Sequence, residues 1–174
     1  MEGGRDGRPD GEVWHYAALK QMEGIAGALD KQDDVAFYAS ESDAFKKRFI
    51  RSFFDVRKGY FTDGLAADTD HASLHGNMFP LAFDLVPAGK KQNVIYFIQT
   101  RGMACSVYGS QFLMDALYEA NDAEYALHML TKTDDRSWYN MIRVGSTISL
   151  EAWDNKYKPN QDWNHAWGAA PANI

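Results

Sequence analysis

The stretch FLMDALYEANDAEYALHML, residues 112–130, decides the fold class of this chain. Its apolar residues recur every three or four positions before and after the polar pair Asn121-Asp122, which is the spacing of two amphipathic helices. Because the connection between the two helices is so short, they have to run antiparallel. The stretch therefore predicts a helix hairpin, with one helix near 112–120 and the next near 123–130.

The same helical period continues upstream of this hairpin. Four more helices are predicted, over residues 12–28, 33–58, 70–85 and 93–101, with Asp70 as the N-cap of the third. The apolar faces that these helices should bury are Trp14, Ala18, Met22, Ile25 and Leu29 on the first, Tyr38, Phe45, Phe49 and Phe53 on the second, and Leu74, Met78, Leu81 and Leu85 on the third. YFTDG at 60–64 reads as a short turn or strand. We expect an all-α fold of antiparallel helix hairpins.

The last third of the chain follows a different pattern. Ile148 and Leu150 predict a brief extended segment, and residues 156–164 form a polar, aromatic loop. Another helix is predicted to begin within HAWGAAPANI at 165–174. With 174 residues and 45% hydrophobic side chains, the chain, residues 1–174, is expected to be a single domain. Together with the glycine-rich beginning, this ending suggests that the domain is an incomplete segment of something larger.

Composition excludes several classes of function. The net charge of −6 and the pI near 5.3 argue against a nucleic-acid partner, since such binding depends on clustered basic side chains. No apolar run approaches the roughly 18–20 residues that a membrane span needs, and the N-terminus lacks a signal-peptide hydrophobic region. The compartment is left open, and secretion or a periplasmic location is compatible with a longer parent protein. The single cysteine, Cys105, is expected to be a small buried hydrophobic residue.

Common cofactor and metal motifs are missing. The sequence contains no GxGxxG after a strand, no GxxxxGK[ST], no HExxH, no CxxC and no GxSxG, so no cofactor is expected. His71 and His75 are four residues apart, a spacing that can place two imidazoles on one metal ion. Without a third ligand, packing or hydrogen bonding is the better interpretation, and we expect no metal site.

Glu151 is the carboxylate with the most unusual surroundings. It follows the small and β-branched run GSTISL, and Trp153, Trp163, His165 and Trp167 come close behind it. A carboxylate among flat apolar rings and hydrogen-bonding groups is typical of a sugar-binding pocket. The alternative is a surface loop whose tryptophans are buried in the core, and the residues alone do not separate these two interpretations.

The motifs in this region resemble those of a known family. They are SW at 137–138, GST at 145–147, EAWD at 151–154, HAW at 165–167 and AP at 170–171, with RDG at 5–7 and HASLHGNMFPLAFDLVP at 71–87 upstream. This series resembles the catalytic domain of bacterial α-L-rhamnosidases, glycoside hydrolase family 78, over nearly the whole chain. The resemblance implies an (α/α)₆ toroid of six helix hairpins, of which the hairpins predicted here would form about half.

The resemblance also implies a chemistry, the inverting hydrolysis of terminal α-L-rhamnose from glycans or glycosides. Within the G-x-T-x-x-x-E-x-W pattern, Glu151 corresponds to the family's general base. The residues that the resemblance assigns to sugar binding are Arg5 and Asp6 from RDG, His165 as a hydroxyl-binding histidine, and Trp138, Trp153 and Trp167 as pocket walls.

One part of the family's pattern has no counterpart in this sequence. The family's general acid lies in an acidic, aromatic segment of the D-x-x-R-x-E type, ahead of the residues present here. An inverting glycosidase needs both carboxyl groups, so the chain alone is expected to be inactive, and to self-associate or to require the remainder of a parent chain. Two alternatives stay open: another glycosidase on the same toroid, and a non-catalytic helical module that binds a glycan or a protein.

Overall fold

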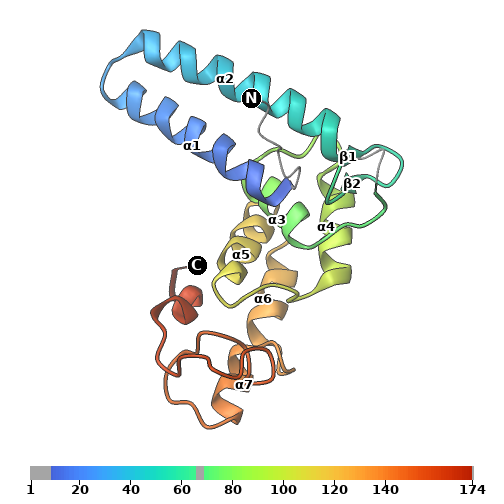
Figure 1. Cartoon of the computed structure of the whole chain (residues 1–174), viewed down its shortest axis with the longest axis vertical. Helices are drawn as coiled ribbons and strands as arrows, with labels where there is room; N and C mark the ends of the chain where they lie inside the picture. The colour runs from blue at the N-terminus through green and yellow to red at the C-terminus, as the bar shows by residue number, and fades with distance from the viewer. Residues whose placement is uncertain (1–8, 66–68, 174) are drawn as a thin grey trace. The chain divides into compact units, whose positions relative to one another are not determined.

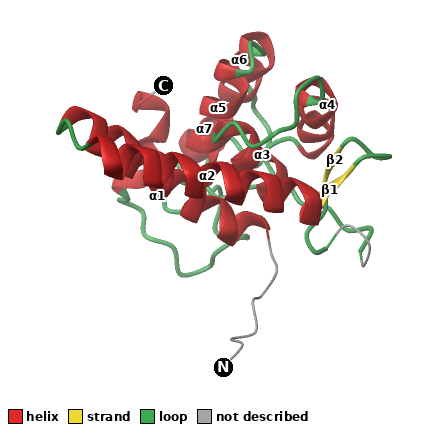
Figure 2. Cartoon of the chain, turned by 90° about the horizontal axis from the view of Figure 1, so that it is seen from above, coloured by secondary structure: helices red, strands yellow, loops and turns green. Residues whose placement is uncertain are grey.

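The computed structural model describes residues 9–65 and 69–173, with side chains up to residue 169. Within this part of the chain, helices dominate and one pair of short strands is present (Figure 2). The elements are α1 Pro9–Ala28, α2 Gln32–Phe53, β1 Phe54–Asp55, β2 Tyr60–Phe61, α3 His75–Ala82, α4 Lys91–Arg101, α5 Gly109–Glu119, α6 Ala123–Thr131, α7 Trp138–Arg143 and the 3₁₀ helix η1 Ala166–Asn173. The chain divides into two compact units, Met1–Val94 and Ile95–Ile174. The single-domain organisation expected from the sequence stays a prediction.

In the first unit, α1 and α2 form an antiparallel hairpin, as predicted (Figure 1). The corner between them is made by Asp30, which has a φ of 56°, and by the backbone bond from Lys31 N to Ala26 O. This is the left-handed residue that commonly ends a helix. The chain can therefore reverse direction within a few residues and begin α2.

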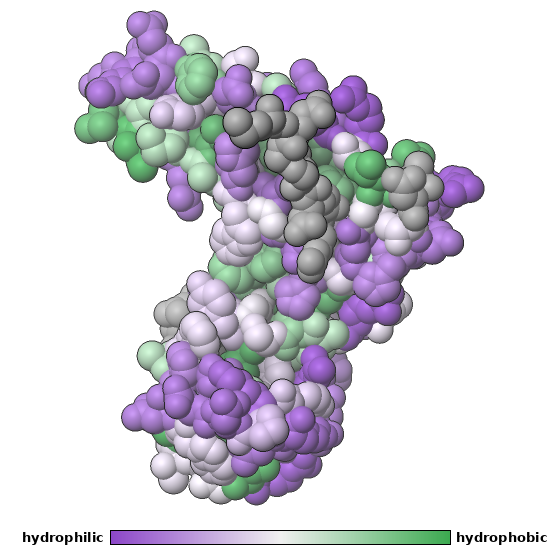
Figure 3. Space-filling model, in the orientation of Figure 1, coloured by the Kyte–Doolittle hydropathy of each residue, from purple (hydrophilic) through white to green (hydrophobic). Residues whose placement is uncertain are grey.

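The apolar stripe predicted for α1 is wrong. Met22, Ile25 and Leu29 are exposed, Leu29 by 62%, and apolar atoms are visible over the tip of this hairpin in Figure 3. The face that α1 buries contains Val13 and Tyr16 instead, because Tyr16 stacks on Phe45 of α2. Helical spacing identifies residues that share a face, but the packing partner decides which face is covered.

The aromatic face predicted for α2 is confirmed. Phe45, Phe49 and Phe53 are buried, and consecutive rings of this row have centroids 5.9 and 5.1 Å apart. The helix ends at Phe53, before the predicted end near residue 58, because the chain turns there into the antiparallel pair β1–β2. Gly59 closes this turn with a φ of 81°, a conformation that favours glycine.

Helix α3 starts later than predicted. Asp70 does not cap it, since its carboxylate pairs with Lys58 at 2.6 Å, and the helix begins at His75. His71 pairs through Nδ1 with Asp63 at 2.6 Å, which agrees with a hydrogen-bonding role for this histidine. The predicted apolar face is buried as expected, at Leu74, Met78, Leu81 and Leu85.

In the second unit, the hairpin at 112–130 is confirmed as α5 and α6. Its corner is Asn121, with a φ of 63°, and Asp122 N donates to Leu117 O at 2.8 Å. Leu113 and Leu117 are fully buried. The carboxylate of Asp122 accepts from Gln99 Nε2 of α4 at 2.8 Å, which ties α4 to the α6 start.

The C-terminal region is largely irregular, as the sequence predicts. A short helix, α7, precedes a loop over 144–165, and no strand is assigned at Ile148 or Leu150. The predicted final helix is present as the 3₁₀ helix η1, because the turns are closed by bonds such as Gly168 N to His165 O at 3.0 Å. Of the described helices, none combines the length and the apolar character that a bilayer crossing requires.

Candidate active site

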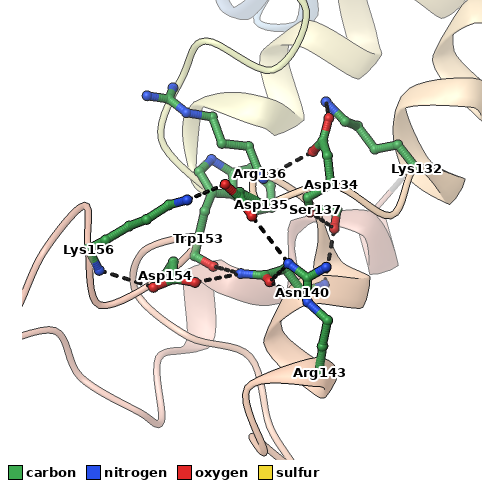
Figure 4. Close-up of polar contacts among 10 residues, drawn as sticks. All are labelled: Lys132, Asp134, Asp135, Arg136, Ser137, Asn140, Arg143, Trp153, Asp154 and Lys156. Carbon is green, nitrogen blue, oxygen red and sulfur yellow. Dashed lines mark hydrogen bonds and ion pairs between the residues drawn. The ribbon is translucent and has the colours of Figure 1, made fainter.

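Helix α7 anchors the loop that carries Glu151. Ser137 caps this helix, since its hydroxyl accepts from Asn140 N at 3.0 Å. The side chain of Asn140 is fully buried, and its Nδ2 donates to Trp153 O at 2.9 Å and to Asp154 Oδ2 at 3.0 Å. Figure 4 shows Asn140 at the centre of these contacts. The segment directly after Glu151 is thus held by the helix before it.

Trp153 belongs to this loop, and its side chain is buried in the core. Its side chain is 2% exposed, and its Nε1 donates to Cys105 O at 2.7 Å. Trp138 approaches it edge-on with ring centroids 4.9 Å apart, and donates from its own Nε1 to Gly168 O at 3.0 Å. These two indoles therefore connect the Glu151 loop to α7 and to η1.

Two segments of the loop run alongside each other around Glu151. Glu151 N donates to Asp162 O at 3.0 Å, and His165 N donates to Ser149 O at 3.0 Å. The Ser149 hydroxyl donates a hydrogen bond to His165 O at 2.9 Å. Gly168 packs against the same backbone, because a Cβ placed there would lie 2.4 Å from Leu150 O. This close approach requires glycine.

The Glu151 carboxylate has two partners. Its Oε1 accepts from Lys158 Nζ, and its Oε2 accepts from Asp162 N at 3.1 Å. The bond from Lys158, supported by that from the Asp162 amide, lowers the pKa of Glu151 below its ordinary value. The side chain is 14% exposed, so the carboxylate reaches solvent. Glu151 is therefore an ionised group at the surface, able to accept a proton.

His165, at the end of the loop, and Trp167 of η1 form a flat aromatic surface. Their rings stack with centroids 4.1 Å apart and planes at 13°, and Trp167 is exposed. His165 Nδ1 is buried and has no hydrogen-bond partner among the described residues. A buried nitrogen of this kind needs a partner, which a water or a ligand hydroxyl can supply.

The structure thus brings together most of the residues that the sequence singled out. Glu151, Trp153 and His165 belong to the loop over 144–165, Trp167 follows in η1 and stacks on His165, and Trp138 of α7 packs against Trp153. Arg5 and Asp6 lie outside the described residues. The assigned roles of all these residues in sugar binding and catalysis stay predictions.

Sequence reasoning missed two residues of this site. Lys158 is seven positions after Glu151, and nothing in its spacing indicates that the two side chains meet. Asn140 lies in the short helix α7, and its burial was the missing information. A polar residue flanked by apolar helix positions was the one available signal.

A separate cavity lies elsewhere in the second unit. It has a volume of about 350 Å³ and its lining includes Arg136, Tyr157 and Asp135, but not Glu151. The guanidinium of Arg136 lies 4.5 Å from the centre of the Tyr157 ring. Among the described residues, no three His, Cys, Asp or Glu side chains are grouped so that they could hold a metal ion.

The chain matches one family model and several solved structures. The model describes the bacterial alpha-L-rhamnosidase 6 hairpin glycosidase domain and matches residues 11–174. Comparison with curated protein sequences gave no match.

Three of the similar structures illustrate the likeness. An alpha-L-rhamnosidase from Dictyoglumus thermophilum is 20% identical with a TM-score of 0.77, over 91% of this chain and 18% of its own. One from Streptomyces avermitilis, complexed with L-rhamnose, is 18% identical with a TM-score of 0.71, over 91% and 16%. A rhamnosidase from Klebsiella oxytoca with rhamnose bound is 15% identical with a TM-score of 0.77, over 94% and 33%. At these identities the likeness concerns the fold, and the chain spans a third or less of each of those proteins.

Proposed function

Because the chain belongs to the family of bacterial α-L-rhamnosidase six-hairpin glycosidase domains, we propose that it is part of a glycoside hydrolase that removes terminal α-L-rhamnose with inversion, and that Glu151 is its general base. The observation that carries this proposal is the Glu151 carboxylate itself. It is held by two donors, kept ionised and partly open to solvent, and the backbone two residues before it is bonded to His165 of the stacked ring pair.

The rhamnose substrate is proposed from the relatives and from the local chemistry. Two of the similar structures are described with rhamnose bound. In this chain, the exposed ring of Trp167 offers a flat apolar surface of the kind that packs against a sugar ring, and His165 Nδ1 lacks a partner. We assign His165 to a sugar hydroxyl and Trp167 to the pocket wall. Trp153 is buried, so we assign it a supporting place beneath the site.

In the proposed reaction, Glu151 accepts a proton from a water molecule as the water oxygen bonds to the anomeric carbon of rhamnose. The bond from that carbon to the leaving oxygen breaks on the opposite face, and a second carboxyl group donates a proton to this oxygen. In inverting enzymes the two carboxyl groups lie roughly 6.5–9.5 Å apart. Glu151 needs to be ionised for its part, which the lowered pKa provides.

The general acid is proposed to come from a segment outside residues 1–174. The sequence has no D-x-x-R-x-E segment, and the matched regions cover only 18% and 33% of the similar structures from Dictyoglumus thermophilum and Klebsiella oxytoca. We propose a sugar-binding role for Arg5 and Asp6, which lie outside the described residues. Residues 1–174 would then supply the base half of a catalytic pair.

The test is hydrolysis of an aryl α-L-rhamnoside by the full-length protein and by its Glu151→Gln variant. Loss of the base should lower kcat by about 10²–10⁴-fold while rhamnose binding is retained. Glu124→Gln is the matched control, because Glu124 is an exposed residue of α6. NMR of the first product formed should show the inverted anomer.

Two results would count against the proposal. If kcat is unchanged in Glu151→Gln, the base is another residue. If the full-length protein binds rhamnose without turning over any rhamnoside, the chain belongs to a binding module instead.

A further inference from the structure

Lys158 lies beside Glu151 and forms an ion pair with it. Its ammonium group contacts Glu151 Oε1, and this is the one ion pair of Glu151 within residues 9–65 and 69–169. The neighbouring cation Lys156 is already paired with Asp135. The two lysines therefore have different partners although one residue separates them in the chain.

The backbone at Lys158 is held by its own turn. Lys158 N donates to Asp154 O at 3.4 Å, and Lys158 O accepts from Gln161 N at 3.1 Å. Gln161 is buried and its Oε1 accepts from Ala152 N at 2.8 Å, next to Glu151. The lysine thus extends from a turn that is bonded to the same segment as its carboxylate partner.

The Glu151 carboxylate is covered more than the lysine, with 14% of its side chain exposed against 42%. An ionised carboxylate has about four lone-pair positions, of which the contacts described here use two. The remaining positions can accept from a water molecule. Since one oxygen is held by Lys158 and the other by the Asp162 amide, the carboxylate cannot rotate without breaking both bonds.

We propose that Lys158 is a positioning residue of the active site: it holds the Glu151 carboxylate in one orientation, with its free lone pairs directed to the attacking water. This inference rests on the proposed role of Glu151 as the base. The charged or titratable side chains that act on Glu151 are Lys158 and His165, and the bond from Lys158 has the largest effect on its pKa, which is lowered.

This placement has a consequence for the pH dependence of the reaction. A base must be deprotonated to work, so the acid limb of kcat/KM reports the pKa of that base in the free enzyme. With Lys158 in contact, Glu151 stays ionised at lower pH. Without the lysine, the Glu151 carboxylate becomes protonated at higher pH, so the acid limb of kcat/KM moves to higher pH.

The experiment measures kcat/KM against pH for an aryl α-L-rhamnoside with the full-length protein, for wild type, Lys158→Met, Lys158→Gln and Lys158→Arg. In Lys158→Met the acid limb should move to higher pH, with a severalfold loss of kcat/KM on that limb. Lys158→Arg should restore the wild-type limb because it keeps the charge. Lys156→Met removes the same charge from the same loop and should leave the limb in place.

Several outcomes would overturn the inference. In one, Lys158→Met and Lys158→Gln, both shown by thermal unfolding to be folded, leave the plateau and the acid limb of kcat/KM unchanged. In another, Lys156→Met shifts the limb as much as Lys158→Met, so that overall charge is responsible. The Glu151→Gln variant separates this inference from the proposed function: if that variant retains activity, the assignment of the base fails, whatever Lys158 does.

Discussion

Asn140 Nδ2 donates to Trp153 O at 2.9 Å, and through this bond helix α7 sets the path of the chain just beyond Glu151 (Figure 4). The same amide reaches Asp154 Oδ2, and Arg143 Nε donates to Asn140 Oδ1 at 3.1 Å. A fully buried amide with all of these partners holds the loop firmly, because each lost bond would leave a buried polar group unpaired.

Replacement of Asn140 by alanine should therefore be costly. Trp153 O would lose its side-chain donor and Arg143 would lose its acceptor, so the free energy of unfolding should fall by about 1–3 kcal/mol. Urea denaturation measures this. Asn160→Ala changes an exposed asparagine and should stay within about 0.5 kcal/mol of wild type. A wild-type midpoint for Asn140→Ala would mean that the loop is held by other contacts.

The two tryptophans Trp153 and Trp163 should respond very differently to phenylalanine. Trp153→Phe removes the Nε1 bond to Cys105 O and leaves space in the core, so we expect a loss of about 1–3 kcal/mol in the free energy of unfolding. Trp163 is 44% exposed, and Trp163→Phe should change stability by less than about 0.5 kcal/mol. Equal effects in chemical denaturation would contradict the buried position of Trp153.

Gly168→Ala tests the close approach of η1 to the Glu151 loop. The new Cβ would lie 2.4 Å from Leu150 O and 2.8 Å from Ser149 Cβ, so the two segments must separate, at about 1–3 kcal/mol of stability. In Gly24→Ala a Cβ would meet no heavy atom within 4 Å, and the helix α1 should gain about 0.5–1 kcal/mol. The unfolding temperature should fall in Gly168→Ala and rise in Gly24→Ala. A neutral Gly168→Ala would show that this backbone can rearrange freely.

Acid should destabilise the second unit through its carboxylates. The pKa of Asp135 is lowered mainly by its hydrogen bond from Lys156, and that of Asp154 by its bond from Asn140. A depressed folded-state pKa contributes stability above the unfolded value, and this contribution is lost as pH falls through the folded value. The urea midpoint should therefore drop below about pH 4, near the ordinary aspartate value.

The variant that checks this prediction is Asp135→Asn, which should flatten the acid dependence of the urea midpoint. Asp33→Asn alters an exposed residue in the first turn of α2 and should leave the dependence as it is. A wild-type midpoint that does not change on acidification would show that these pairs contribute nothing to stability.

Cys105 should be inert toward thiol reagents in the folded protein. Burial raises the pKa of its thiol to about 12, and the side chain is only 4% exposed. Both effects suppress the reactive thiolate. At neutral pH, a disulfide reagent should label Cys105 only in molecules that have unfolded. A cysteine introduced in place of the exposed neighbour Ala104 should react in the folded protein. Rapid labelling of the native wild-type protein would be inconsistent with the packing around Trp153 and Cys105.

The helical organisation was predictable where local patterns and packing agree. The hairpin around Asn121 and the aromatic face of α2 follow from residue spacing and from a residue type that tolerates positive φ. The stripe on α1 was mispredicted, since its residues Met22, Ile25 and Leu29 lie on a face that stays exposed. The late start of α3 was missed because Asp70 pairs with Lys58, a contact that no helix-capping rule contains.

The all-α class, the family motifs and the choice of Glu151 among many carboxylates could be predicted from the sequence, because helical periods and short motifs are local in the chain. The contacts of Glu151 with Lys158 and Asp162, and the burial of Asn140 and Trp153, became visible in the folded chain. These contacts join residues 7 to 48 positions apart. Their strength depends on distance, angle and burial, which the chain acquires when it folds.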